Sequence, residues 1–154
     1  MGIINKVTRN IAGLNKKGDF PVYYLYTTGA AGRIFFGNLK EKGEFTGGKC
    51  PACSRVYFPL RIYCEECFEE IKEFVKLPLK GRVVTFTVVA RDIDGRGFDA
   101  PRTAAFVNIE GSCGGIFGFV KDGGVEIGDQ VEAVLKSKKE RNGTMDDILH
   151  FRKL

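Results

Sequence analysis

The order of apolar and polar residues predicts one helix near the start of the chain. Residues 30–42 carry four apolar residues at helical spacing, which places them on one face: Ala31, Ile34, Phe35 and Leu39. Gly43 follows two lysines in the last turn and is a suitable C-terminal stop. Phe36 lies beside this apolar stripe, where it either adds to the core or contacts a partner.

After residue 73 the pattern changes to short alternating runs, which predict five strands. The runs are Val84-Phe86-Val88, Ala105-Val107-Ile109, Phe117-Phe119, Val131-Ala133-Leu135 and Leu149-Phe151. We expect Leu149 and Phe151 to point inward, with His150 solvated between them. Asn142-Gly143 is the strongest two-residue hairpin signal and precedes the last strand. Short strands separated by turns are typical of a small barrel or sandwich.

These patterns divide the 154 residues into three parts. We expect an N-terminal arm and helix at 1–43, a cysteine-containing segment at 44–72 and a barrel at 73–154. The length suits one domain or two small ones sharing a core. No apolar window is long enough to span a membrane. The first residues lack the apolar segment of a secretory signal, so we expect a cytoplasmic protein with reduced thiols.

The formal net charge of +5 lies mainly near the N-terminus. Residues 1–48 carry seven basic residues against three acidic ones, whereas residues 77–154 carry twelve against eleven. A nucleic-acid-binding protein usually concentrates basic residues in a stripe. The near-neutral barrel therefore makes nucleic acid an unfavoured partner.

Four cysteines in two CxxC pairs form the strongest chemical signal. Cys50 and Cys53 are followed, ten residues later, by Cys64 and Cys67. Each pair predicts a tight turn that aims two thiolates at one point, so the two pairs predict a tetrahedral four-sulfur site. Zinc is favoured over rubredoxin-type iron, and disulfides are disfavoured in a reducing compartment. A site with four protein ligands has no open position, so the one Zn²⁺ is expected to be structural.

No catalytic motif is found in the sequence. The remaining cysteine, Cys113, lies in a glycine-rich turn, and the only histidine, His150, lies on the last predicted strand. A cysteine nucleophile needs a base within hydrogen-bond reach, and His150 is the only candidate. We interpret both residues as ordinary packing or surface residues, and we do not expect this chain to be an enzyme by itself.

The cysteine segment, KCPACSRVYFPLRIYCEEC, resembles a known family. These are the zinc-ribbon/OB-fold proteins that accompany acyl-CoA enzymes, long described as a domain of unknown function. The barrel half matches the family in the Thr-rich strand after Gly81, in AFVNIEG and in the Ile127-Gly128 turn. The chain departs from the family after Cys67, where Phe68-Glu69-Glu70 stands and no tryptophan occurs. The resemblance covers residues 30–151.

The resemblance implies a fold and a role. The implied fold is mainly β with an N-terminal helix: a rubredoxin-like zinc ribbon followed by a five-stranded OB-fold barrel. Members are typically non-catalytic accessory subunits of a thiolase-like enzyme, such as one that cleaves 2-benzoylsuccinyl-CoA, and they form hetero-oligomers with it. The catalytic subunit would perform the chemistry on an acyl-CoA. The pathway is left open.

Site residues implied by this role fall into two groups. Coenzyme A contact is expected from three arginines around the 92–102 loop, beside Phe98: Arg91, Arg96 and Arg102. Guanidinium groups suit its phosphates, although the aspartates of the same loop offer them simpler pairing. Partner contact is expected from Tyr24, Phe35 and Phe36.

Two other functions remain open from the residues alone. Zinc ribbons and OB-folds also occur in single-stranded nucleic-acid-binding proteins, in which aromatic side chains stack on bases. An iron-loaded four-sulfur site would instead make the chain an electron carrier, and its colour would reveal the metal.

Overall fold

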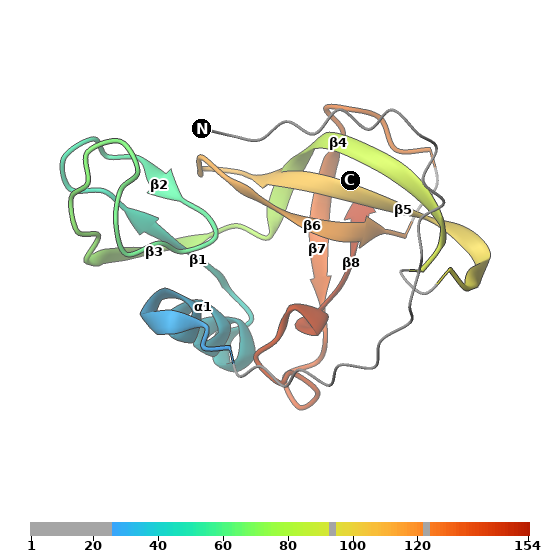
Figure 1. The fold of residues 1–154 in the computed structure, drawn as a ribbon, viewed down its shortest axis with the longest axis horizontal. Helices are drawn as coiled ribbons and strands as arrows, with labels where there is room; N and C mark the ends of the chain where they lie inside the picture. The colour runs from blue at the N-terminus through green and yellow to red at the C-terminus, as the bar shows by residue number, and fades with distance from the viewer. Residues whose placement is uncertain (1–25, 93–94, 122–123) are drawn as a thin grey trace, which may run out of the picture.

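The computed structural model describes residues 26–92, 95–121 and 124–154 (Figure 1). The elements run in the order α1 (Gly29–Lys42), β1 (Phe45–Lys49), β2 (Val56–Tyr57), β3 (Glu73–Leu77), β4 (Lys80–Arg91), β5 (Gly97–Ile109), β6 (Gly115–Val120), β7 (Gln130–Leu135), a 3₁₀ turn η1 (Met145–Asp147) and β8 (Ile148–Lys153). The chain is mainly β with an N-terminal helix, as predicted. No helix in these described ranges is long and apolar enough to cross a membrane.

Helix α1 forms where the apolar spacing predicts it. Phe35 and Leu39 are buried, and Phe36 is half-buried against the same core. Gly43 adopts a left-handed conformation (φ 67°), and its N–H donates to the carbonyls of Asn38 and Leu39. A glycine satisfies the helix end at this conformation without a Cβ penalty.

A three-stranded sheet in the order β2-β1-β3 supports the cysteine segment. Gly47 and Gly48 of β1 are buried, and a Cβ at either position would lie within 3.0 Å of neighbouring atoms, among them Leu77 Cδ1 and Ile71 Cγ2. Glycine therefore lets side chains pack directly on the strand. Since β3 pairs with β1 along its whole length, this sheet extends to Leu77, beyond the boundary expected at residue 72.

The remaining five strands close into a barrel in the order β4-β5-β6-β8-β7 (Figure 1). Strands β6 and β8 are parallel, and the other pairs are antiparallel. This five-stranded closed arrangement is the OB-fold that the resemblance implied. Phe151, Val107, Val131 and Ile109 fill its interior and are 0% exposed.

One continuous core joins the helix, the ribbon sheet and the barrel. Phe35 of α1 lies 5.6 Å from Phe58 between ring centroids, and Phe58 lies 5.0 Å from Phe45. These aromatic residues belong to the same buried cluster as the barrel residues Val107 and Phe151. The helix and the sheet thus fix the position of the cysteine segment against the barrel.

The predicted inward direction of Leu149 on β8 is wrong, and both β4 and β8 carry a register shift. In β4 the pairing with β5 shifts between Val83 and Thr85; Val83 is buried, whereas Val84, Phe86 and Val88 are 46%, 40% and 60% exposed. In β8 the pairing with β7 shifts so that Leu149 has no opposite residue, and Leu149 is 50% exposed. A bulge of one residue changes which side chains face the core.

The predicted two-residue hairpin at Asn142-Gly143 is also wrong. A longer link joins β7 to β8, and it includes η1. The buried carboxylate of Asp147 accepts hydrogen bonds from the backbone N–H groups of Asn142, Gly143 and Thr144 at 2.9, 2.7 and 3.3 Å. Arg141 in the same link donates to the carbonyl of Leu39, so the link also caps α1.

Candidate metal centre

The four cysteines of the two CxxC pairs converge on one point. Their sulfur atoms all lie within 4.8 Å of one another, and the Cys53 and Cys64 sulfurs are 3.7 Å apart. Four thiolates around a tetrahedral zinc ion, each about 2.3 Å from the metal, would be about 3.8 Å apart. The donor set and its spacing therefore fit one tetrahedral metal ion.

Both pairs are built on the same backbone turn. In the first turn, Ser54 N–H donates to the Cys50 carbonyl at 3.0 Å; in the second, Phe68 N–H donates to the Cys64 carbonyl at 3.0 Å. Ser54 and Phe68 both take a left-handed conformation, with φ of 59° and 58°. A non-glycine residue rarely adopts this conformation, so its repetition indicates that the turns are held in a defined geometry.

The site is shielded from water on one side. Cys50 and Cys64 are buried, Cys53 and Cys67 are half-buried, and Ile71 packs beneath them. The Tyr57 hydroxyl lies 3.1 Å from the Cys64 sulfur, and the Arg61 guanidinium lies over the Tyr57 ring. Sequence reasoning missed Tyr57. The position of a tyrosine between two cysteine pairs does not show whether its hydroxyl reaches a cysteine sulfur.

Hydrogen bonds shift the pKa values of the Cys64 and Cys67 thiols in opposite directions. Burial raises the pKa of Cys64, but hydrogen bonds from the Tyr57 hydroxyl and from backbone N–H groups outweigh it and lower that pKa to about 6. The hydrogen bond with Cys53, followed by burial, raises the pKa of Cys67 to about 12. The Cys64 thiolate therefore forms readily, whereas Cys67 loses its proton only when a metal ion replaces it.

Charged pairs surround the metal-binding turns at the surface. Arg55 of the first turn pairs with Glu66 of the second at 2.6 Å, and Arg61 pairs with Glu65. All four side chains are about half exposed, so these pairs contribute little stability by themselves. The Arg55–Glu66 pair links the two turns on the side facing solvent, whereas Arg61–Glu65 lies at the second turn alone.

Cys113 and His150 lie apart, as interpreted from sequence. Cys113 is exposed in the turn before β6, where its N–H donates to the Val56 carbonyl of the ribbon at 2.7 Å. His150 is half-buried on β8, next to Phe151, which pairs with Val120 at the far end of β6. The six residues of β6 span about 20 Å, so the thiol and the imidazole do not meet.

The residues expected to bind coenzyme A lie at the β4–β5 hairpin. The Arg102 guanidinium lies 4.4 Å from the ring centre of Phe98 and 5.8 Å from that of Phe119. Arg91 and Arg96 are exposed, and in the described part of this hairpin no aspartate forms an ion pair with any of the three arginines. The Asp92 carboxylate instead accepts a hydrogen bond from the Arg96 backbone N–H.

The residues expected to contact a partner are placed differently from one another. Phe35 is 3% exposed and belongs to the core, and Phe36 is half-buried against it. Tyr24 lies outside the described residues. A larger apolar surface lies on the outer side of β5 and β6, where Phe117 and Phe119 are 70% and 41% exposed. The Phe106 ring packs 4.9 Å from that of Phe117. The sequence marked these phenylalanines only as strand residues.

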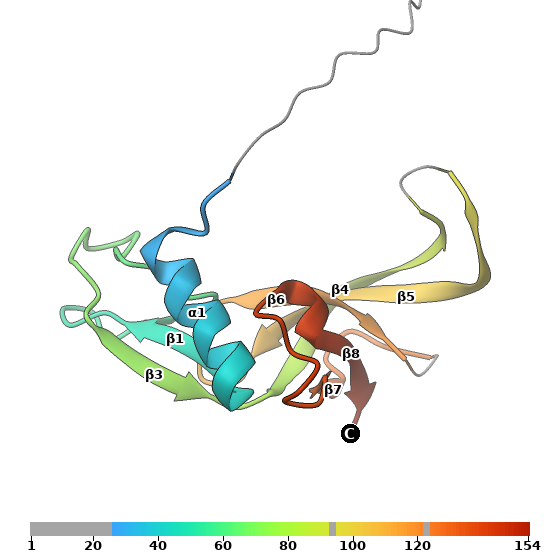
Figure 2. The ribbon, with the colours of Figure 1, turned by 90° about the horizontal axis from the view of Figure 1, so that it is seen from below.

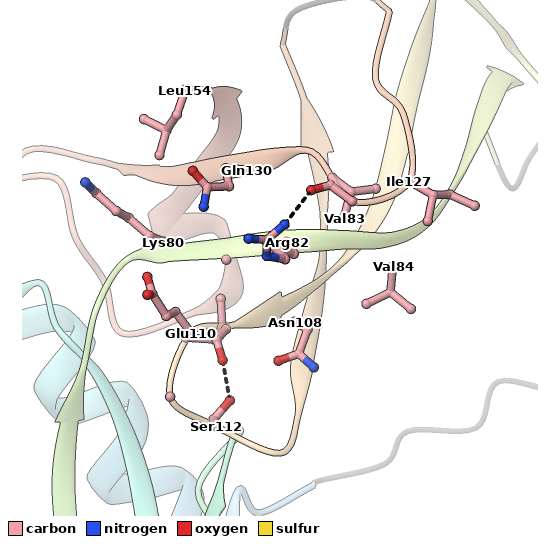
Figure 3. A pocket seen from close by; sticks show the side chains of 14 residues that line it. Lys80, Arg82, Val83, Val84, Asn108, Glu110, Ser112, Ile127, Gln130 and Leu154 are labelled. Carbon is pink, nitrogen blue, oxygen red and sulfur yellow. Dashed lines mark hydrogen bonds between the residues drawn. The ribbon is translucent and has the colours of Figure 1, made fainter.

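A cavity of about 640 Å³ lies beside β4 and is lined by residues of β4, the end of β5 and the turn after it, the turn before β7, and Leu154 (Figure 3). Lys80, Arg82 and Glu110 line it together with apolar side chains that include Val84 and Ile127. Arg82 points along its wall and donates to the Gly128 carbonyl at 3.3 Å. A second cavity of about 480 Å³, lined by Arg102, Phe119, Lys121 and His150, lies at the other end of the barrel.

Comparison with known proteins supports the fold and the ribbon. Residues 38–73 match the family described as ChsH2, rubredoxin-like zinc ribbon domain. The structure resembles a DUF35-family protein of unknown function from Sulfolobus solfataricus, with a TM-score of 0.62, 27% identity and coverage of 82% of this chain and 85% of that one. It also resembles a chain of the Ltp2-ChsH2(DUF35) aldolase, with a TM-score of 0.56, 18% identity and coverage of 79% and 93%.

A curated relative gives the strongest sequence evidence. The DUF35 domain-containing scaffold protein of Methanothermobacter thermautotrophicus is 33% identical over 106 residues, which cover 67% of this chain and 80% of the relative. The matched zinc-ribbon segment contains all four converging cysteines. The chain therefore belongs to the DUF35 family of zinc-ribbon/OB-fold proteins.

Proposed function

We propose that this chain is a non-catalytic accessory subunit that binds one structural Zn²⁺ and scaffolds a thiolase-type enzyme acting on acyl-CoA. The scaffold role is supported by the relative from Methanothermobacter, which is described as a scaffold protein. A ChsH2(DUF35) chain that shares this fold is part of an aldolase assembled with Ltp2. Both proteins carry the domain that this chain shares.

The metal site supports a structural role for zinc. Four sulfur ligands complete a tetrahedral shell, so no position is left for a substrate or a water nucleophile. The two thiols most strongly affected by hydrogen bonding, Cys64 and Cys67, bind the metal instead of acting as nucleophiles. Zinc would thus hold the two turns together and do no chemistry.

The observation that carries the scaffold role is the exposed aromatic face on β5 and β6, formed by Phe106, Phe117 and Phe119. Phe117 is 70% exposed and packs on Phe106. Aromatic residues are enriched in protein interfaces because they bury a large area at a low entropic cost. A catalytic subunit covering this face would remove its phenylalanines from water.

Coenzyme A contact would come from the neighbouring end of the barrel. Arg102, held between Phe98 and Phe119, forms one wall of the 480 Å³ cavity with Lys121. Two cations beside aromatic rings suit a phosphate group next to an adenine base. Arg91 and Arg96 extend this positive region along the hairpin.

The decisive experiment is native mass spectrometry of the untagged protein purified from its own cell. We expect a complex with a larger catalytic subunit, and we expect Phe117→Ala/Phe119→Ala to weaken it. Tyr63→Ala is the matched control, since Tyr63 is 61% exposed on the ribbon. A chain that purifies without any catalytic subunit would contradict the proposal.

The coenzyme contact is tested separately by calorimetric titration of the purified complex with coenzyme A. We expect Arg96→Ala/Arg102→Ala to weaken binding, and Arg152→Ala to leave it unchanged, because Arg152 of β8 forms an ion pair with Glu132 of β7. Unchanged affinity in the double variant would remove the coenzyme role and leave the scaffold role standing.

One observation favours a second function, binding of single-stranded nucleic acid. The aromatic face lies on strands that OB-folds commonly use to stack bases, and Arg102 and Lys121 lie beside it. Fluorescence anisotropy with a labelled single-stranded oligonucleotide decides between the two. Tight binding that weakens as salt rises and is lost in Phe117→Ala/Phe119→Ala would favour nucleic acid.

A further inference from the structure

The outer edge of β4 is left without a partner strand over most of its length. Strand β7 pairs with β4 only at Lys80–Arg82, and Val83 then exchanges hydrogen bonds with Gly128 and Asp129. From Val84 onward, no strand among the described residues pairs with this edge, while β5 pairs with the opposite one. The β4–β5 hairpin therefore extends beyond the closed part of the barrel (Figure 2).

This free edge lacks the features that normally protect an edge strand. Residues 83–90 read VVTFTVVA, a run rich in β-branched residues that contains no charge, proline or glycine. Val84, Phe86 and Val88 are 46%, 40% and 60% exposed. Natural sheets usually protect such an edge with lysine, proline or a covering loop. The composition favours pairing with another strand.

The sequence of the edge is symmetric about Phe86. The seven residues VVTFTVV read the same in both directions. If two copies pair antiparallel about a two-fold axis at Phe86, Thr85 lies opposite Thr87 of the second copy, and Val84 lies opposite Val88. Threonine–threonine and aromatic cross-strand pairs are favourable, and the uncharged run contains no like charges to repel.

We propose that the chain forms a two-fold dimer through antiparallel pairing of β4 residues 84–88 with the same residues of a second copy. An isologous interface requires a self-complementary surface, which a palindromic strand provides. A different protein strand would gain nothing from this symmetry.

The surroundings of the edge limit the length of the pairing. The turn at Ile127-Gly128 already occupies the edge at Val83, so the second copy's strand ends its pairing after residue 88. Ile127 is 71% exposed and lines the same cavity as Val84 (Figure 3), so this end of the second copy's strand would cover it. Five paired residues form a small interface, and we expect dimerisation to depend on protein concentration.

The dimer and the proposed catalytic subunit would use different surfaces. The aromatic face lies on β5 and β6, whereas the pairing edge belongs to β4. A dimer of this chain would thus hold two catalytic subunits in one assembly. Dimerisation itself does not depend on the proposed function.

Charged substitutions at positions that face each other across the dimer test the pairing. Dimerisation of the metal-loaded chain is measured by sedimentation velocity. Thr85 and Thr87 are exposed, so both can be replaced by charged residues. We expect Thr85→Lys/Thr87→Lys and Thr85→Glu/Thr87→Glu each to raise the dimer dissociation constant at least about tenfold, because like charges would face each other. An equimolar mixture of the two variants should dimerise again.

The control variant is Lys138→Glu/Lys139→Glu, in an exposed turn away from β4, and it should dimerise like wild type. Wild type that stays monomeric over the whole concentration series overturns the proposal. Charge variants that still form homodimers, or a mixture that fails to form heterodimers, also overturn it.

A measurement on unaltered protein guards against variants that fail to fold. Hydrogen–deuterium exchange of wild type at low and high concentration should show concentration-dependent protection within residues 84–88, at the amides that face the free edge instead of β5. Amides of β7 should be protected equally at both concentrations, because β7 lies inside the closed barrel. Equal exchange at 84–88 at both concentrations overturns the proposal.

Discussion

The ribbon and the barrel are held together in different ways. Outside the shared core, the buried cluster of the ribbon comprises Cys50, Tyr57, Cys64 and Ile71, and two of these belong to the four cysteines positioned to bind a metal ion. Among the residues that the structure describes, the cluster that includes the barrel interior contains sixteen buried residues. A small segment cannot bury enough apolar area to order itself, so it relies on a metal ion. We therefore expect the metal to control one region and packing to control the other.

Metal removal should produce the largest difference between the ribbon and the barrel. A structural zinc site contributes roughly 10 kcal/mol or more of binding free energy, which is available to ordering only while the metal is bound. We expect chelation to expose the amides of residues 50–71 to hydrogen exchange while the β7 and β8 amides stay protected. Because β1 and Phe58 join the shared core, a partial loss of stability should reach the barrel as well. Equal loss of protection in both regions would show that they fold as one unit.

The second largest effect should come from a cavity in the barrel. Phe151 is 0% exposed and packs against Gly118, where an added Cβ would lie 2.7 Å from its ring. We expect Phe151→Ala to lower the free energy of unfolding by about 3–5 kcal/mol, measured by urea denaturation of the metal-loaded protein. Metal content should stay at wild-type level. Phe117→Ala is the matched control, because Phe117 is 70% exposed and its loss should cost less than about 0.5 kcal/mol.

Both the fold class and the convergence of the four cysteines were predictable from sequence, for a physical reason. Helical spacing, turn residues and CxxC spacing are local patterns, and each maps directly onto a local geometry. The helix, the five barrel strands and the four converging cysteines lie where these patterns indicate.

Features that depend on two strands at once were not predictable. The bulge at Leu149 decides which side chains of β8 face the core, and the register shifts of β4 and β8 exist only in the pairing of β4 with β5 and of β7 with β8. Strand β1 was missed because its Thr46-Gly47-Gly48 segment shows no apolar alternation. Its glycines make room for residues that are distant in sequence.

The β7–β8 link gives a smaller effect that depends on pH. Burial alone would raise the pKa of the Asp147 carboxyl. Hydrogen bonds from three backbone N–H groups and the positive charge of Lys136 outweigh it and lower the pKa below its ordinary 3.8. Its stabilising contribution is therefore complete above that value and is lost as pH falls through the folded-state pKa.

We expect Asp147→Asn to lower the free energy of unfolding by about 1–3 kcal/mol at neutral pH, because the amide cannot accept all three bonds. Urea denaturation of wild type and variant at each pH provides the measurement. The difference in unfolding free energy between wild type and variant should decrease as the pH falls toward the folded-state pKa of Asp147. Asp146→Asn, one residue earlier and exposed, is the control. A difference in unfolding free energy that stays constant down to low pH would show that the charge of Asp147 is not the source of its stabilising effect.

The smallest expected effect concerns the Tyr57 hydroxyl. It tests whether the zinc affinity of the ribbon depends on the four cysteines alone or also on a neighbouring side chain. The Tyr57 hydroxyl is 3.1 Å from the Cys64 sulfur and helps to lower the pKa of that thiol to about 6. Groups that hydrogen-bond to metal ligands typically change metal affinity 10–100-fold. We expect Tyr57→Phe to weaken zinc binding about tenfold in competition with a chelator, with the loss larger at low pH, where Cys64 would be protonated. The control is Tyr63→Phe. Tyr63 is exposed on the ribbon, and this variant should bind zinc like wild type. Equal zinc affinity in Tyr57→Phe and wild type would mean that the four sulfurs alone set the affinity, and that the ribbon contributes only their positions.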